Sequence, residues 1–295
     1  MSGKQIEGAS IEIAEGRAKT VLEKMGAGGL RGKELMQRLN GLTMEQIQEG
    51  ARAVSSDWLP VVDRLVLPRD PFTPDAPKLS EYVPMILGNT HDETAVPAPP
   101  GGMTWANAPE ALDRAVHQYL GPYTAAEVVT EFRKIHPEYM PEQVDEAAAT
   151  AFRAWPGQRM EAEERAENPV SLPRTWVYQM NFPGANGRAM HTIDIPFMFD
   201  NIVVDERQVG TAPEHLAGAK GLAATMSEML ITFGRSGNPN YDGMPHWPAY
   251  DLRNRSTMVW DTPAHGGAHV VNDPRGAERV FAEKAHYNQA GTPLP

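Results

Sequence analysis

The chain has 295 residues, and 41% of them are hydrophobic, a composition typical of a globular protein with a sizeable buried core. Its 27 Lys and Arg residues stand against 38 Asp and Glu, a formal charge of -11, which disfavours nucleic acid and membrane surfaces as partners. It contains no cysteine, which excludes disulfides, thiolate metal sites and a Cys nucleophile.

Targeting signals are not evident in the sequence. No stretch approaches the roughly 20 consecutive apolar residues that cross a bilayer. The opening MSGKQIEGASIE lacks the basic start and apolar middle of a signal peptide. These features predict a soluble, cytoplasmic protein.

The first predicted elements are three helices. Apolar residues recur at steps of three and four after Ser10, a suitable N-cap, and the pattern stops at Gly26. A second, short helix is expected around residues 35–39. A third is expected to open at Thr43, whose spacing to Gln46 is that of a capping box.

The middle of the chain alternates in character. Residues 59–84 are rich in proline and therefore predict a connector through which no helix runs. Residues 84–88 form a short apolar run ended by glycine, which suits a buried strand. Helical patterns resume at residues 107–120, 124–135 and 141–167, and we expect Pro156-Gly157 to interrupt the last of them.

Residues 175–182 are rich in aromatic and β-branched side chains and predict a strand. Thr211 and Glu214 have capping-box spacing, which predicts the start of a long helix that ends at Gly234. Two short strands and a closing helix are expected at residues 258–260, 269–271 and 276–286. Helices that alternate with isolated apolar strands indicate an α/β fold.

Functional groups of an open α/β sheet gather where its strands end. The strand at 84–88 leads into Asn89-Thr-His-Asp-Glu93, and the strand at 175–182 leads into the loop that carries His191. An acid and a histidine could therefore meet at one edge of the sheet. A carboxylate that accepts the Nδ1 proton of an imidazole fixes its tautomer, so that Nε2 can act as a general base. The order acid, then histidine, is that of the α/β-hydrolases.

Several segments resemble the C-terminal part of a type B carboxylesterase, the family of cholinesterases and bacterial para-nitrobenzyl esterases. They are LPVVDRLVLPRDPFTPDAPKLSEYVPMILGNTHDETA, AMHTIDIPFMFDN, FGRSGNPN and HWPAYDLRNRSTMVWD, and they occur in the order of the family. The resemblance implies a mostly parallel α/β-hydrolase sheet flanked by helices, and a single incomplete domain over residues 1–295. It also implies that Glu93 is the acid and His191 the base of a catalytic triad.

The family nucleophile is a serine in a G-x-S-x-G elbow, and this sequence contains no such motif. The glycine-rich oxyanion loop is missing as well. In the family both features precede the region that this chain resembles, so we expect a half-site without the first strands and without activity of its own. An unpaired sheet edge then predicts association with the missing N-terminal portion, or self-association.

Other residues could carry chemistry but are better explained by structure. His265 and His269 have a spacing that could hold a metal on a helix, yet two glycines lie between them, so we predict neither a metal site nor a cofactor. Asp92 competes with Glu93 for the role of the acid, and the family register favours Glu93. Asp194 and Asp200 are expected to form ion pairs or caps. Trp105, Trp155 and Trp247 could line a pocket, and core packing is the role we favour for them.

The sequence leaves several functions open. The favoured one is a part of a serine carboxylesterase that acts on a small carboxylic ester once the missing portion is present. One alternative is a catalytically inactive relative that binds another protein, as cholinesterase-like adhesion domains do, although such a domain would need neither Glu93 nor His191. Another is a fragment with no function of its own. The ester itself is not identified by the sequence.

Overall fold

The chain is described here from a computed structural model, which covers residues 5–54 and 59–289. These residues divide into two compact units, one of residues 75–288 and one of residues 5–54 and 59–74 with Gln289. Each unit is described by itself. The expectation of a single domain over residues 1–295 stays a prediction.

The smaller unit contains the three helices expected near the start of the chain: α1 (Ile11–Lys24), α2 (Gly32–Asn40) and α3 (Met44–Ala51). The Ser10 hydroxyl accepts a hydrogen bond from the Ile13 amide at 3.3 Å, and both halves of the Thr43 capping box are present. Local signals thus predicted these helices correctly. Their packing is shallow, because α1 and α2 contain no buried residue.

A four-stranded sheet forms the centre of the larger unit, in the order β1-β2-β3-β4. The strands are β1 (Met85–Thr90), β2 (Thr175–Met180), β3 (Ser256–Trp260) and β4 (Ala268–Asn272). The first three run parallel, and β4 pairs antiparallel with β3. The predicted sheet, mostly parallel and flanked by helices, is confirmed.

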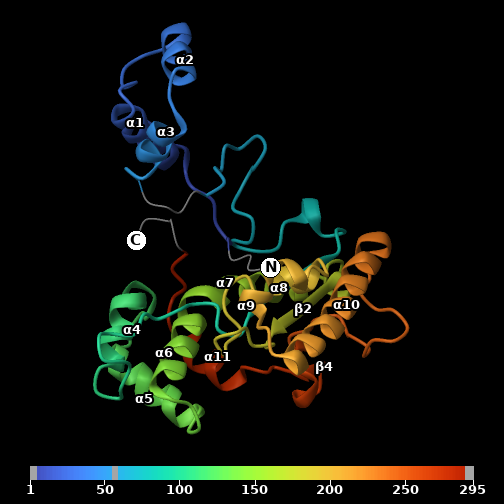
Figure 1. Ribbon diagram of the computed structural model, residues 1–295. Helices are drawn as coiled ribbons and strands as arrows, with labels where there is room; N and C mark the ends of the chain where they lie inside the picture. The colour runs from blue at the N-terminus through green and yellow to red at the C-terminus, as the bar shows by residue number, and fades with distance from the viewer. Residues whose placement is uncertain (1–4, 55–58, 290–295) are drawn as a thin grey trace. The chain divides into compact units, whose positions relative to one another are not determined.

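Both faces of the sheet are covered, as a parallel sheet requires. Trp176, Tyr178 and Met180 of β2 pack into one apolar cluster with α8 (Asp194–Met198) and α10 (Pro213–Ser236). Val177 points to the other face, where it packs with Ala162 of α7 (Trp155–Glu167). Figure 1 shows α10, in orange, beside β2 and β4.

A separate helical layer lies at the other side of this unit in Figure 1. It consists of α4 (Ala108–Val116), α5 (Ala125–Ile135) and α6 (Pro141–Ala149), which share one apolar cluster with part of α11 (Gly276–Ala282). The interruption expected at Pro156-Gly157 lies earlier, at a π-helical segment, Thr150–Ala154. Pro156 is instead in the first turn of α7, where its missing N–H leaves no hydrogen bond unmade.

The predicted ends of the long helix were wrong. Ala212, not Thr211, is the N-cap of α10, and no side chain caps it, because Pro213 begins the helix with a preset backbone angle. The helix also continues past Gly234 to Ser236. Gly237 ends it in the left-handed conformation, at a φ of 74°, with its amide bonded to the Phe233 carbonyl at 2.7 Å.

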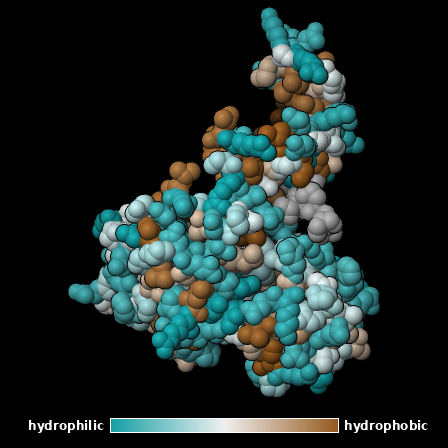
Figure 2. Space-filling view, turned by 180° about the vertical axis from the view of Figure 1, so that it is seen from behind, coloured by the Kyte–Doolittle hydropathy of each residue, from teal (hydrophilic) through white to brown (hydrophobic). Residues whose placement is uncertain are grey.

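Short elements complete the described chain. They are α9 (Glu206–Val209) and the 3₁₀ turns η1 (Lys78–Ser80), η2 (His117–Tyr119), η4 (Leu172–Arg174), η5 (Ile202–Asp205) and η6 (Pro263–His265). Across residues 5–54 and 59–289, no helix is long and apolar enough to cross a bilayer. Hydrophilic residues cover most of the face shown in Figure 2, with apolar patches between them.

Candidate active site

The register of β1 and β2 brings two loops to the same edge of the sheet. Met85 pairs with Thr175 at one end and Thr90 with Met180 at the other, so the two parallel strands finish level. The His91 amide continues the pairing with a 2.8 Å hydrogen bond to the Met180 carbonyl. The loop after β1 and the loop after β2 therefore start side by side, as the sequence predicted.

Glu93 is held in a buried position at this edge. Its Oε2 accepts hydrogen bonds from the Thr90 amide at 3.0 Å and from the Thr90 hydroxyl at 2.8 Å. The side chain of Glu93 is only 4% exposed. Two donors on one oxygen fix the carboxylate and leave Oε1 to point toward the neighbouring loop.

Oε1 of Glu93 contacts Nδ1 of His191, a residue 98 positions away in sequence. The histidine side chain is 63% exposed, whereas its carboxylate partner is buried. A buried carboxylate at Nδ1 favours the tautomer that carries its proton there, so the lone pair is on Nε2. Nε2 makes no hydrogen bond within the described part of the chain. The pair predicted from sequence is thus in contact, with one nitrogen held and the other available.

Asp92 fastens the two loops together rather than joining this pair. Its amide donates to the Ala189 carbonyl at 3.0 Å, and its Oδ2 accepts from the Ala189 amide at 2.9 Å. Its Oδ1 bonds to Nδ1 of His91 at 2.8 Å. Burial acts to raise the pKa of Asp92, but the bond and the charge of His91 outweigh it, so the pKa lies below its ordinary value. Asp92 thereby fixes the backbone two residues before His191.

The segment that carries His191 is also held by a hydrogen bond to β2. The Tyr178 hydroxyl donates to Asp194 at 2.7 Å, and both residues are buried. Burial raises the pKa of Tyr178 well above its ordinary value, and the negative charge of Asp194 adds to this shift. The Tyr178 ring crosses β1 at Gly88, where any Cβ would collide with it. Glycine in β1 is therefore needed for the tyrosine to reach α8.

The residue after His191 has a strained backbone. Thr192 has a φ of 74°, which is uncommon for a β-branched residue, and its hydroxyl accepts from the Gln208 amide group at 3.2 Å. Strained residues cluster at functional sites because the surrounding structure must hold them in place. Here the strain turns the chain between the imidazole and α8.

A cavity of about 290 Å³ adjoins the pair. Its walls include both side chains, Thr94, Met190 and Arg153 of the π-helical segment. The Thr94 amide donates to the Thr150 hydroxyl at 3.0 Å, which ties this segment to the loop of Glu93. The volume is at the lower end of the range of small-molecule sites.

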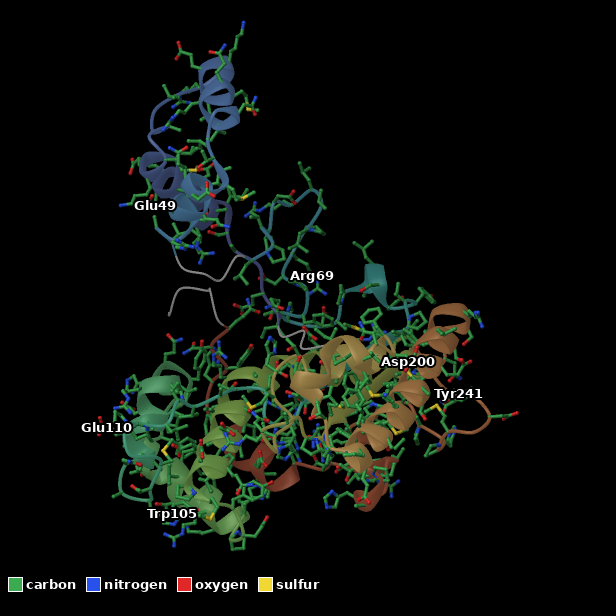
Figure 3. The ribbon with its side chains drawn as sticks, viewed as in Figure 1. Glu49, Arg69, Trp105, Glu110, Asp200 and Tyr241 are labelled. Carbon is green, nitrogen blue, oxygen red and sulfur yellow. The ribbon has the colours of Figure 1, made fainter. Side chains whose placement is uncertain are left out.

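The remaining candidates lie elsewhere. Asp194 begins α8 and accepts from tyrosine, and Asp200 follows that helix, where Figure 3 labels it. His265 is in η6 and His269 in β4, so they do not share a helix. Within the ranges that the structure describes, no group of three His, Cys, Asp or Glu side chains is placed to hold a metal ion.

The tryptophans differ from one another. Trp247 is fully buried, as expected for core packing. Trp105 is 36% exposed and lies in the region of α4 (Figure 3), with the Arg133 guanidinium 4.3 Å from its ring centre. Trp155 packs against the apolar cluster of the helical layer and also lines a cavity of about 280 Å³, so it fits both roles that the sequence left open. That cavity is formed with α11 and does not include His191.

Sequence reasoning missed two residues of the site. One is Thr90, although Thr90 and Glu93 have the Thr-x-x-Glu spacing of a capping box, in which the acid reaches back to the amide three residues earlier. The other is Arg153, which the helical pattern over residues 141–167 hides. No signal in the sequence marks the π-helical turn that directs it to the cavity.

Comparisons with known proteins show the family of the chain. The sequence model of the carboxylesterase family matches residues 1–275. Para-nitrobenzyl esterase of Bacillus subtilis is 27% identical over 225 residues, which are 75% of this chain and 42% of that protein. Acylcarnitine hydrolase of Mus musculus is 25% identical over 276 residues, 87% of this chain and 47% of that protein. The chain thus spans about half the length of these relatives.

Solved structures share the fold. The carboxylesterase EST55 of Geobacillus stearothermophilus, in its structure at pH 6.2, superimposes with a TM-score of 0.64 at 24% identity. The match covers 92% of this chain and 55% of that one. A thermophilic para-nitrobenzyl esterase gives the same TM-score at 21% identity. The four strands and their helices therefore form part of an α/β-hydrolase fold.

Proposed function

Because the chain belongs to the carboxylesterase family, we propose that it supplies the base and the orienting acid of a serine esterase that hydrolyses a small carboxylic ester. The contact between Nδ1 of His191 and Oε1 of Glu93 carries this proposal. It joins two residues from separate strand ends, and it leaves Nε2 beside a cavity. A structural ion pair would have no need to expose the imidazole in this way.

The reaction follows from the roles of the two groups. Nε2 of His191 takes the proton of a serine hydroxyl as the serine oxygen bonds to the acyl carbon of the ester. Glu93 stabilises the imidazolium so formed. The same proton then passes to the departing alkoxide, and an acyl-enzyme remains. Water then gives a proton to Nε2 as its oxygen bonds to the acyl carbon. That proton passes to the serine oxygen as the bond between serine and acyl group breaks and the carboxylic acid leaves.

The serine and the oxyanion donors are proposed to come from polypeptide outside this sequence, which contains no G-x-S-x-G elbow. The position of β1 supports this arrangement, because β1 is an outer strand of the described sheet and Glu93 follows directly after it. A segment that pairs alongside β1 would end next to the Glu93–His191 pair. We therefore expect the chain to have no esterase activity by itself, and to associate through this edge.

Complementation tests the proposal. The chain is mixed with, and separately fused to, the part of the Bacillus subtilis relative that precedes the region similar to it. Association is followed by size-exclusion chromatography and hydrolysis with a short-chain para-nitrophenyl ester. We expect hydrolysis only when both parts are present, and none with the chain alone. Stable association without any gain in hydrolysis would refute the proposal. The cytoplasmic location stays a prediction that this experiment does not test.

A further inference from the structure

Arg153 is a cation in the wall of the cavity beside His191, and its guanidinium has no partner in the part of the chain that the structure describes. Neighbouring arginines differ in this respect. Arg159 pairs with Glu163 at 2.7 Å, and Arg165 donates to the Val83 carbonyl at 2.7 Å. These two serve the packing of α7, whereas the Arg153 guanidinium forms no such bond with a residue that the structure describes.

The backbone that carries Arg153 is well fixed. It belongs to the π-helical segment Thr150–Ala154, a geometry that appears mostly as single turns and frequently at functional sites. Thr150 is fully buried and accepts from the Thr94 amide, next to Glu93. The guanidinium is thus presented from a backbone position that is tied to the loop of the catalytic acid.

A second polar group in the same wall also lacks a partner. Thr94 is 5% exposed, and its hydroxyl makes no hydrogen bond to any described residue. Buried hydroxyls are usually satisfied, so this one indicates that an acceptor is missing from the protein side.

Local charge, rather than the charge of the whole chain, decides what this cavity attracts. The formal charge of -11 repels anions in general, but it is screened beyond about 8 Å at physiological ionic strength. Within the cavity, Glu93 is already bound by Thr90 and His191. Arg153 is therefore the charged group of this wall whose hydrogen-bond donors are not used by any described residue.

We propose that Arg153 binds a carboxylate of the substrate, so that the ester acted on is a monoester of a small dicarboxylic acid. This inference rests on the proposed esterase function, and it names the substrate class of that site. A guanidinium suits the role because its parallel N–H groups match the two oxygens of a carboxylate. Bound there, the free acid group of the substrate would orient its ester group relative to Nε2 of His191.

Binding to the chain by itself provides the test, since it needs no nucleophile. Monomethyl succinate, an anion, and dimethyl succinate, its neutral analogue, are titrated while the ring resonances of His191 are followed by NMR. We expect the anion to bind more tightly than the neutral ester. We expect Arg153→Gln to lower the affinity for the anion by about tenfold or more, because a charged hydrogen-bond pair is lost. The affinity for the neutral ester should not change.

Two further variants keep the result interpretable. Arg153→Lys retains the charge but not the paired donors and should bind the anion with intermediate affinity. Arg133→Gln removes an exposed arginine that stacks on Trp105 and should leave binding unchanged. Equal affinity of the parent chain and Arg153→Gln for monomethyl succinate would overturn the inference, and so would the absence of any binding.

The same experiment separates this inference from the esterase function. Arg153-dependent binding without hydrolysis after complementation would leave the carboxylate site intact and refute the esterase. Hydrolysis after complementation, with the same relative rates on anionic and neutral esters in the parent and in Arg153→Gln, would support the esterase and refute the carboxylate site. In an active complex, we expect Arg153→Gln to lower kcat/KM for a para-nitrophenyl monoester of succinic acid, but not for para-nitrophenyl butyrate.

Discussion

Two pairs of imidazole and carboxylate lie at the same edge of the sheet, and they are built in different ways. His91 and Asp92 are neighbours in sequence, with 2.8 Å between Nδ1 and Oδ1, and their side chains are 21% and 17% exposed. His191 and Glu93 come from different strand ends, and the imidazole is 63% exposed over a carboxylate that is 4% exposed. Only the second pair combines a sheltered acid with an accessible base.

The other contacts of the two acids explain the difference. Asp92 uses Oδ2 to accept from the Ala189 amide, so its carboxylate holds the backbone of the loop together. Glu93 uses Oε2 to accept from Thr90 within its own loop, which fixes the acid and leaves Oε1 to contact His191. Proximity of an acid and a histidine is therefore not sufficient to identify a catalytic pair. The second oxygen of the acid and the exposure of the ring distinguish the two.

The largest expected effect separates the two histidines. In the active complex, His191→Gln should lower kcat by roughly 10³- to 10⁴-fold, because the general base is lost. His91→Gln should stay within a few-fold of the parent, since among the described residues that imidazole is hydrogen-bonded to Asp92 alone. Both are measured as initial rates of para-nitrophenyl ester hydrolysis after association has been verified. A reversed order would assign the base to His91 and break the comparison.

The acids should differ in the same direction. Glu93→Gln keeps the shape of the side chain but removes the charge that stabilises the imidazolium, and we expect a loss of roughly 10²- to 10³-fold in kcat. Asp92→Asn should retain most of the activity per folded molecule. The fraction of folded protein is determined by circular dichroism before rates are compared. Equal losses in the two variants would mean that the acids act as one network.

Much of this edge could be anticipated from the sequence. The apolar runs in the sequence predicted β1 and β2. Because these parallel strands end at the same level, the residues that follow them lie close together. The assignment of Glu93 over Asp92 came from family resemblance, because local sequence does not reveal which carboxylate faces His191. That choice depends on the direction of side chains in a tight loop, which only the folded backbone fixes.

The missed features have a common cause. Thr90 and Glu93 repeat the contacts of the capping box at Thr124 and Glu127, where the amide and hydroxyl also donate to one carboxylate oxygen, at 2.9 and 2.8 Å. The same local motif begins a helix in one place and fixes the proposed acid, Glu93, in the other. Arg153 depends on one extra residue in a helical turn, and the start of α10 depends on Pro213. Such shifts by single residues are decided by tertiary packing.

The order of the two pairs should be reversed when the effect of substitution on stability, rather than on kcat, is compared. Asp92→Asn is expected to lower the free energy of unfolding by about 1–3 kcal/mol, since it weakens buried, charged hydrogen bonds. His191→Gln should cost less than about 1 kcal/mol, because the ring is largely exposed. Urea unfolding, monitored by circular dichroism, measures both. A larger loss for His191→Gln would show that the exposed pair holds the loop.

The effect of Asp92 should also depend on pH, and its direction is fixed by the lowered pKa. In acid, the unfolded chain binds the proton of this carboxyl more readily than the folded chain does, so stability rises with pH through that range. The contribution is complete above the ordinary value of 3.8 and is lost as the pH falls through the folded value. The difference between the parent and Asp92→Asn should therefore shrink in acid, and a constant difference would contradict the assignment.

The smallest expected effect concerns Thr90, and it tests whether the shared Thr-x-x-Glu motif has acquired a different use. Thr90→Val keeps the shape of a fully buried side chain and the backbone amide, but it removes the hydroxyl that donates to Glu93. With one of two donors left, we expect kcat of the active complex to fall by about 3- to 10-fold. Thr124→Val removes the matching hydroxyl at the start of α5, which is exposed and distant in sequence from the pair. It should cost about 1 kcal/mol of stability and leave kcat unchanged.

If both variants lowered kcat equally, the hydroxyl at position 90 would be a structural cap like its counterpart, and the orientation of Glu93 would rest on the Thr90 amide alone.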